Sequence, residues 1–357
     1  MERINVTKTF LPPIEEYHQY VREIWQNGQI TNQGPLLVQL EDRLEQHLGV
    51  SNLHFVANGT VALQLAIKAL GIEDGEIITS PFSYVASTSA ILWEKCTPVF
   101  VDIEPDTFCI DPDKIEAAIT DKTRAILAVH VFGYPCDIEK IEEIAKNHKL
   151  KVIYDSAHAF GASYNGKSLM SYGDISTGSF HATKLFHTVE GGCVIVNDKL
   201  ASDKVELMKR FGHNGDDHIM LGINAKSSEL HAAMGLCNLK YADEIIQKRK
   251  AVSEKYEQLL GDKFLRPKAK EGLTYNYAYY PIIFESEEQL LSAVKQLNDN
   301  NIFPRRYFFP SLNELSYIES SNSCPISEDI SRRILCLPLY DSLDNQNIEK
   351  ICEVLSK

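Results

Sequence analysis

Lys184 lies in a segment whose side chains could do carbonyl chemistry. Residues 179–192 read SFHATKLFHTVEGG, so the lysine stands among two histidines, hydroxyl groups, an acid and a glycine pair. A lysine amine becomes nucleophilic near neutral pH when burial or a neighbouring cation lowers its pKa. From these residues alone, Lys184 could be a surface cation, a phosphate ligand or an amine that attacks a carbonyl.

Two other segments offer groups that a phosphorylated heterocycle would need. Residues 58–60, NGT, begin a helix-periodic run, and free amides at a helix start bind phosphate, although an ordinary helix cap has the same sequence. Asp155 ends the apolar run VIYD, where a carboxylate is costly unless it meets a cation such as a protonated ring nitrogen. A solvent-exposed turn is the alternative for Asp155. His158 could contact the same ring.

An aromatic side chain and a set of phosphate ligands complete the candidate site. In TSPFSYVAST (79–88) we expect Phe82 in the core and Tyr84 stacked on a planar ligand. Gly59, Thr60 and Ser179 would hold a phosphate. A phosphate, an aromatic face, a basic ring nitrogen and an aldehyde within reach of a lysine together describe pyridoxal 5′-phosphate, whose chemistry uses a lysine Schiff base and an acidic partner of the ring nitrogen.

Composition restricts the kind of protein. At 357 residues the chain is long enough for two domains, and its net charge of −13 argues against a nucleic-acid partner. No apolar run approaches the ~20 residues of a membrane span, and the first residues carry no secretory signal, so we expect no membrane association and a cytoplasmic protein. The eight cysteines have no zinc spacing, which predicts reduced thiols and no metal site.

Strand and helix patterns alternate over residues 58–200, which predicts an α/β fold with a mostly parallel sheet covered on both faces. Ligands of such sheets bind at the carboxyl ends of the strands. One long helix is expected over about 228–260, bridging two domains. The pattern then changes to that of a smaller α+β domain, so we predict a large domain over 1–240 and a small one over 241–357.

Several motifs in this order resemble one family. They are NGTVAL (58–63), TSPFSYVAS (79–87), DSAHAFG (155–161), SFHATK (179–184), EGG (190–192) and GINAKSSELHAAMG (222–235). Over nearly its whole length the chain resembles the fold-type-I pyridoxal-phosphate enzymes of the DegT/StrS sugar aminotransferase family. The resemblance implies a large cofactor-binding domain with an N-terminal arm, a mostly parallel mixed sheet and a small C-terminal α+β domain.

The resemblance also implies roles for individual residues. Lys184 would form the Schiff base with the cofactor and later carry the proton, and Asp155 would pair with the ring nitrogen. His158 stands where many relatives have glutamine, near the cofactor hydroxyl. The stacking and phosphate contacts would come from Tyr84, Ser179, Gly59 and Thr60.

Asn224 matches an asparagine that in this family reaches the phosphate from a neighbouring subunit. The resemblance therefore implies a homodimer with shared active sites. Relatives often continue with a bulky residue and an arginine, whereas this chain has Ala225 and Lys226. A lysine is a point charge and not a bidentate fork, so the substrate contacts here are expected to differ.

Within the family, ITNQGPLLVQLEDRL (30–44), HATKLFHTVEGG and GINAK are most similar to enzymes that aminate C4 of a dTDP-4-keto-6-deoxyhexose. The resemblance implies amino transfer from L-glutamate to dTDP-4-keto-6-deoxy-D-glucose, giving dTDP-4-amino-4,6-dideoxy-D-glucose and 2-oxoglutarate. The alternatives are C3 amination of a dTDP-3-keto-6-deoxyhexose, formation of the galacto epimer, and use of a UDP-sugar. A product destined for an O-antigen or lipooligosaccharide follows by family analogy alone.

We expect the substrate to contact cationic side chains, since a nucleotide sugar carries a diphosphate. Arg305, Arg306 and Tyr307 in NIFPRRYFFP are candidates, although a solvated strand end has the same composition. His187 and Glu190 could face the substrate or serve a structural role.

Two rival classes are weaker. Sugar dehydratases of the family replace the lysine by histidine, but Lys184 is present. A non-catalytic nucleotide-binding module would need a G-x-G-x-x-G or a P-loop, and the sequence has neither.

Overall fold

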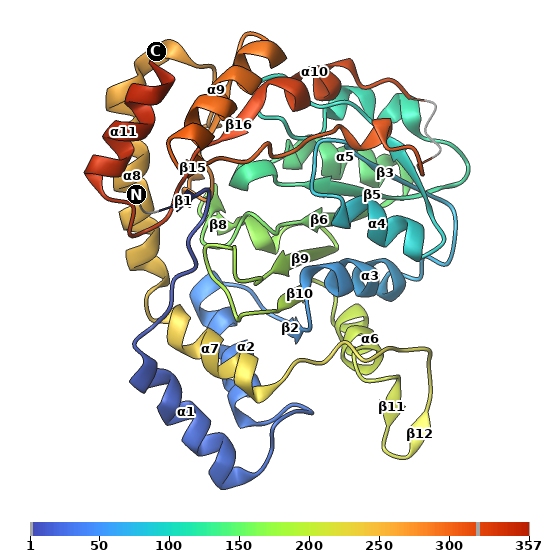
Figure 1. Cartoon of the computed structure of the whole chain (residues 1–357). Coiled ribbons are helices and arrows are strands. Elements are labelled where there is room, and N and C mark those ends of the chain that lie inside the picture. The colour runs from blue at the N-terminus through green and yellow to red at the C-terminus, as the bar shows by residue number, and fades with distance from the viewer. Residues whose placement is uncertain (1–2, 319–321, 357) are drawn as a thin grey trace.

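The centre of the molecule is one seven-stranded sheet (Figure 1). The computed structural model describes residues 3–318 and 322–356. In order across the sheet, the strands are β2 (Leu53–Val56), β10 (Gly192–Val196), β9 (Ile175–Ser179), β6 (Lys151–Asp155), β5 (Thr123–Val129), β3 (Glu76–Thr79) and β4 (Thr97–Phe100). Only β10 runs antiparallel to its neighbours. The predicted mostly parallel mixed sheet is confirmed.

Helices pack on this sheet and bury its apolar strands. The helices of this region are α1 (Ile14–Asn27), α2 (Pro35–Leu48), α3 (Gly59–Ala69), α4 (Ala86–Trp93), α5 (Ile138–His148), α6 (Lys199–Met208) and α7 (Glu229–Leu239). α3 packs against β9 and β10, and α5 against β6. Strands β5 and β6 are buried along nearly their whole length, as expected for parallel strands covered on both faces.

The strand directions place one set of ends together. Since β10 is antiparallel to both β2 and β9, the strands β2, β9, β6, β5 and β3 all point the same way. Their carboxyl ends therefore share one edge of the sheet, with the start of β10 among them. Asp155 and Ser179 are the last residues of β6 and β9, so this edge is where the predicted site must lie.

The C-terminal part has a second apolar core, and its elements lie beside the central sheet (Figure 1). It is built from α8 (Ala242–Leu260), α9 (Glu287–Asp299), α11 (Asn345–Leu355), β14 (Pro281–Ile283) and β16 (Ile334–Cys336). The strand β1 (Ile4–Asn5) joins it by pairing with β15 (Ile302–Phe303). The helix α10 (Pro325–Arg333) reaches back to the large core through Ile330. The predicted boundary between residues 240 and 241 stays a prediction.

The remaining strands form small two- and three-stranded sheets. They are β7 (Ser163–Tyr164), β8 (Lys167–Ser168), β13 (Leu273–Thr274), β11 (His213–Asn214) and β12 (Asp217–His218). The hairpin of β11 and β12 projects from the body beside α6 (Figure 1).

The prediction of one long helix over 228–260 is wrong, because the chain breaks between α7 and α8. Lys240 and Tyr241 make i→i+3 bonds to Cys237 and Asn238, at 3.3 and 3.0 Å, which tighten the last turn of α7. Both side chains also bind Glu16 of α1. This tertiary contact is invisible in the helical period of the sequence.

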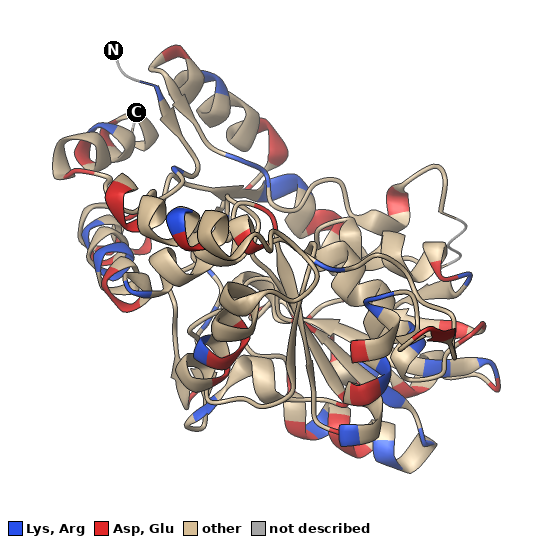
Figure 2. Cartoon of the chain, turned by 90° about the horizontal axis from the view of Figure 1, so that it is seen from below, with Lys and Arg blue, Asp and Glu red and all other residues tan. Residues whose placement is uncertain are grey.

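Charged residues of both signs are interspersed on the outer helices (Figure 2). Among the described residues, no helix has the length and apolar character that crossing a bilayer requires.

Candidate active site

A pocket of about 660 Å³ lies at the shared carboxyl edge of the sheet. It brings together ten of the predicted residues: Lys184, Asp155, His158, Gly59, Thr60, Tyr84, Ser179, Glu190, Arg305 and Tyr307. These residues come from segments between Gly59 and Tyr307, far apart in the chain, so their convergence is a property of the fold. His187, Arg306 and Asn224 do not line it.

Lys184 lies half-buried in a turn after β9. Burial lowers the pKa of its amine, and the negative charge of Asp155 opposes this shift. Its Nζ lies 3.4 Å from the hydroxyl oxygen of Tyr279. A lowered pKa leaves more of the amine neutral near pH 7, which is the nucleophilic and basic form.

Asp155 is fixed by two hydrogen bonds. Its Oδ2 accepts from the Ser87 hydroxyl at 2.7 Å, and its Oδ1 accepts from the Ala157 amide at 3.0 Å. The side chain is buried and lines the pocket. A buried carboxylate held in this way is positioned to pair with a cationic group of a ligand.

His158 has its protonation pattern set by the backbone. The Phe132 amide donates to Nδ1 at 3.1 Å, so the proton of the neutral ring sits on Nε2. Burial, with a smaller effect of Lys184, lowers the pKa of His158 well below its usual value. The ring stacks on Phe308 with centroids 5.6 Å apart. His158 therefore offers a neutral N–H donor, in keeping with its predicted place near a hydroxyl.

The start of α3, at Gly59 and Thr60, has the features of an anion-binding site. The Asn58 side chain accepts from the Val61 amide at 2.9 Å, and the Asn58 carbonyl accepts from Ala62 at 3.1 Å. This cap leaves the first two amides of the helix, those of Gly59 and Thr60, at the pocket. Helix N-termini of this kind bind phosphate through amides and the helix dipole.

Two glycines let the strands approach that helix start. A Cβ on Gly192 would lie 2.7 Å from the Gly59 nitrogen, and a Cβ on Gly59 would lie 2.9 Å from the Cβ of Ser179. Larger residues at either position would displace the helix start or the Ser179 side chain. Glycine is therefore required at positions 59 and 192, because the chain packs tightly around the start of α3.

This set of groups fits pyridoxal 5′-phosphate. The amides of α3 and the Ser179 hydroxyl suit a phosphate, the buried Asp155 suits a protonated ring nitrogen, and Lys184 suits an aldehyde. The pocket volume of about 660 Å³ is within the usual ligand range of roughly 300–1,000 Å³.

The aromatic predictions for 79–88 have separate outcomes. Phe82 is fully buried and packs edge-on against Phe308 at 5.6 Å, as predicted for a core residue. Tyr84 lines the pocket and is 61% exposed, so its ring is accessible to a planar ligand.

The structure places two predicted substrate residues elsewhere. The buried His187 donates from Nε2 to the Phe10 carbonyl at 2.7 Å and accepts the Val189 amide on Nδ1 at 3.2 Å, so it anchors the N-terminal segment. Arg306 pairs with Glu287 at 2.7 Å and covers the Phe309 ring. Their contacts are structural.

Asn224 is exposed, follows the β11–β12 hairpin, and accepts from the Lys226 amine at 2.9 Å. It does not line the pocket of its own chain, and its predicted role toward a second copy stays a prediction.

The sequence did not single out Tyr279 and Phe308, which line the pocket, or Ser87, which donates to Asp155. Ser87 lies three residues after Tyr84 in the same motif, so helical spacing could have indicated it. Tyr279 lies in the aromatic run YNYAYYP, which reads as a strand and gives no sign of which tyrosine faces Lys184. Only the fold makes this choice.

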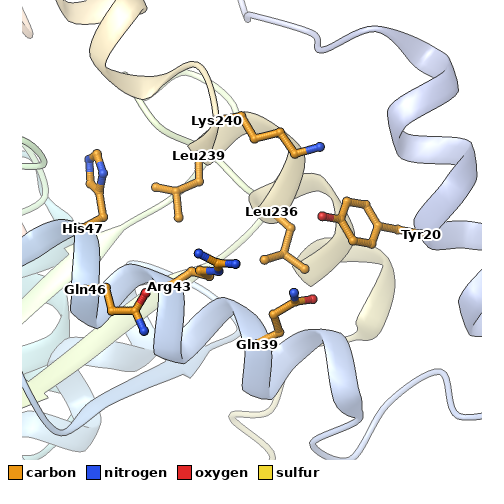
Figure 3. Close-up of a pocket in the computed structure, with 8 residues that line it drawn as sticks. All are labelled: Tyr20, Gln39, Arg43, Gln46, His47, Leu236, Leu239 and Lys240. Atoms are coloured by element: carbon orange, nitrogen blue, oxygen red, sulfur yellow. The ribbon is translucent and has the colours of Figure 1, made fainter.

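A second pocket, of about 450 Å³, lies between α1, α2 and α7 (Figure 3). It is lined by Tyr20, Gln39, Arg43, Gln46, His47, Leu236, Leu239 and Lys240. The Lys240 amine is paired with Glu16 at 2.7 Å. None of the predicted site residues lines this pocket.

Comparison with known proteins identifies a family whose cofactor fits the pocket described above. Residues 13–356 match the DegT/DnrJ/EryC1/StrS aminotransferase family. A dTDP-4-amino-4,6-dideoxy-D-glucose transaminase of Shigella dysenteriae is 40% identical, over 99% of this chain and 98% of the relative. A GDP-perosamine synthase of Escherichia coli O157:H7 is 35% identical, over 95% of this chain and 94% of the relative.

Solved structures show the same fold. DesI, crystallised with its TDP-sugar product, matches with a TM-score of 0.95 at 28% identity, covering 99% of this chain and 92% of that one. A putative sugar aminotransferase of Streptococcus pneumoniae in its PMP form matches at 0.90 and 25% identity, over 98% and 96% of the two chains. The chain therefore belongs to the DegT/DnrJ/EryC1/StrS family and is a pyridoxal-phosphate-dependent nucleotide-sugar aminotransferase.

Proposed function

We propose that this enzyme transfers the amino group of L-glutamate to C4 of dTDP-4-keto-6-deoxy-D-glucose. The products are dTDP-4-amino-4,6-dideoxy-D-glucose and 2-oxoglutarate. The observation that carries this substrate is the likeness to two transaminases of that name, 40% and 38% identical over 99% of the chain.

The contacts of the pocket residues support the chemical roles that we propose for them. The cofactor supplies an electron sink for the charge left when a proton leaves carbon. The Lys184 amine would take this proton at Nζ and hand it on within the half-reaction that deaminates the donor, and it would move a proton in the opposite direction when the sugar is aminated, since the two halves are chemical reverses. Asp155 holds a proton on the ring nitrogen, and His158 donates from Nε2 to the cofactor hydroxyl.

The phosphate ligands in this proposal are the α3 amides and the Ser179 hydroxyl. Tyr84 stacks on the ring from the exposed side. Gly59 and Thr60 each offer a backbone amide to the phosphate. At the start of α3, the Thr60 hydroxyl is the one side-chain group that these two residues add.

The sugar diphosphate would lie toward the pocket mouth near Arg305. Arg305 lines the pocket, with its guanidinium 5.9 Å from the ring centroid of Tyr307. Glu190 also lies at the mouth, 3.5 Å from His181. Arg306 and His187 are left out of the proposed substrate contacts, because their side chains are engaged elsewhere.

A homodimer with shared active sites is part of the proposal. The segment just before Asn224 exposes four apolar side chains that a second copy would cover: Phe211 45%, Ile219 55%, Leu221 81% and Ile223 41%. Contiguous exposed apolar surface of this kind marks interaction sites. In such a dimer Asn224 would reach the partner's phosphate. We also propose a cytoplasmic enzyme whose product enters a glycan such as an O-antigen or lipooligosaccharide.

A second candidate is a GDP-linked ketosugar, favoured by relatives such as the GDP-perosamine synthase noted above. C3 amination, the galacto epimer and UDP-sugars also remain alternatives, since the cofactor site is the same for all of them. A relative at 31% identity is a UDP-2-acetamido-2-deoxy-3-oxo-D-glucuronate aminotransferase.

The test is product identification. The purified enzyme is incubated with pyridoxal phosphate, L-glutamate and, in separate reactions, dTDP-4-keto-6-deoxy-D-glucose and a GDP-linked 4-ketosugar, and the products are analysed by NMR. We expect an equatorial amine at C4 of the dTDP-sugar and faster turnover than with the GDP-sugar. An axial amine, an amine at C3, or preference for the GDP-sugar would contradict the proposal.

A further inference from the structure

The hydroxyl group of Tyr279 faces the amine of Lys184. Among the described residues, it is the side chain that hydrogen-bonds with Lys184, with Nζ and Oη 3.4 Å apart. It lines both the main pocket and a small cavity on the other side of Lys184. None of the predicted roles accounts for this residue.

Two side chains hold the segment that carries Tyr279 in place. The buried Asn276 donates to the carbonyls of His158 and Phe160, at 2.8 Å each. Arg249 of α8, also buried, donates from Nε to the Tyr277 carbonyl at 2.9 Å. These buried hydrogen bonds fix the chain just before Tyr279.

Further contacts fix Tyr279 itself. The Tyr275 hydroxyl, 3.1 Å from the Tyr279 carbonyl, holds its backbone. The Tyr279 ring meets the His158 ring at 4.8 Å and 66°, and the Phe132 ring at 5.3 Å. The hydroxyl is therefore presented to Lys184 from a rigid frame, as pre-organised sites require.

We infer that Tyr279 is a positioning residue for Lys184: its hydroxyl holds the free amine in the orientation needed to move protons. This inference rests on the proposed proton-carrying role of Lys184. A flexible lysine side chain released from a covalent bond would otherwise sample many rotamers, and each misplaced rotamer lowers the rate. Burial raises the pKa of Tyr279, so its hydroxyl stays protonated and neutral.

Other groups also face the Lys184 amine. Asp155 from β6, Tyr84 after β3, Tyr307 and His158 all interact with it electrostatically. None of these four side chains is within hydrogen-bond distance of Nζ. Among the described side chains, only the Tyr279 hydroxyl is. Removing this one hydroxyl thus changes the hydrogen bonding of the amine and leaves those charges in place.

The experiment compares Tyr279→Phe with Tyr277→Phe, a neighbouring tyrosine that lines neither cavity. The first readout needs no cofactor and no substrate: in the apoenzyme, the rate of Lys184 modification by an amine-specific reagent is followed against pH by peptide mass spectrometry. Since a hydroxyl oxygen stabilises the ammonium more than the neutral amine, Tyr279→Phe should shift this profile to lower pH. Tyr277→Phe should leave it unchanged.

The second readout is exchange of the α-proton of the amino donor in D₂O, which needs no sugar. Tyr279→Phe should slow exchange about tenfold at unchanged KM for the donor, as expected for one lost hydrogen bond. Fluorotyrosine at position 279, which keeps the packing and weakens the oxygen as acceptor, should shift the modification profile in the same direction if the phenylalanine variant does not fold. Wild-type values in both readouts, or equal effects of the two phenylalanine variants, would overturn the inference. A failed sugar assay alone would not affect it.

Discussion

Lys184, Asp155 and His158 each owe their chemistry to one or two neighbouring groups. Burial, more than any single charge, lowers the pKa of the Lys184 amine and keeps the His158 ring neutral. The Phe132 amide then decides which nitrogen of His158 carries the proton. The residue types alone give the possible chemistry, and these partners, distant in sequence, select among the possibilities.

Adjacent arginines offer a matched test of the substrate contacts. Arg305 lines the pocket, whereas Arg306 pairs with Glu287. In steady-state assays with the nucleotide sugar, Arg305→Gln should raise KM for the sugar about tenfold, or more, by loss of a charge-assisted contact, with KM for the amino donor unchanged. Arg306→Gln should leave both KM values near wild type. Equal effects of the two substitutions would show that Arg305 has no special role.

The sequence largely predicts which residues meet at the pocket, because these residues stand at element boundaries. Asp155 and Ser179 end strands, and Gly59 begins a helix, so pattern and motif place them together at one sheet edge. Arg306 and His187 are predicted from their residue types and their neighbours in the sequence, and nothing in the sequence shows that Glu287 and the Phe10 carbonyl occupy them. Tyr279 was missed for the same reason.

Among the elements, α2 and α7 are joined by a buried cap that the helical period does not show. Glu229 at the start of α7 accepts the amides of Leu36 and Leu37 in the first turn of α2, at 2.8 and 2.9 Å. A Cβ on Gly34 would lie 2.4 Å from the Glu229 carboxyl carbon. A carboxylate at a helix N-terminus is favourable because it meets free amides and the positive end of the dipole. Gly34, the glycine of ITNQGP, is therefore needed because a side chain at this position would collide with Glu229.

Strand and helix alternation predicted the central sheet correctly, but helix ends depend on tertiary contacts. The break between α7 and α8 occurs where α1 binds Lys240 and Tyr241 through Glu16. In the C-terminal part, β14 and β16 have three residues each and are shorter than the runs YNYAYYPIIFE (275–285) and RILCLPL (333–339) that contain them. Such ends are set by the neighbours that take the remaining hydrogen bonds.

At the scale of the whole molecule, the proposed dimer predicts complementation between defective chains. Lys184→Ala and Asn224→Ala homodimers should each have little activity at limiting cofactor. When the two are unfolded, mixed and refolded, half of the dimers are mixed, and each of these holds one intact site, so activity should rise to about a quarter of wild type. No recovery, with mixed dimers demonstrated by mass, would show that each site lies within one chain.

The most direct test of the account is to locate the cofactor's covalent bond. The holoenzyme is reduced with borohydride, digested, and its peptides are examined by mass spectrometry, with Lys184→Ala as the control. Because Lys184 is the one lysine of the described residues that lines the pocket with Asp155 and the α3 amides, we expect a single pyridoxyl-phosphate adduct on Lys184 and none in the variant. An adduct on another lysine, or a wild-type protein that binds the cofactor without any adduct, would contradict it.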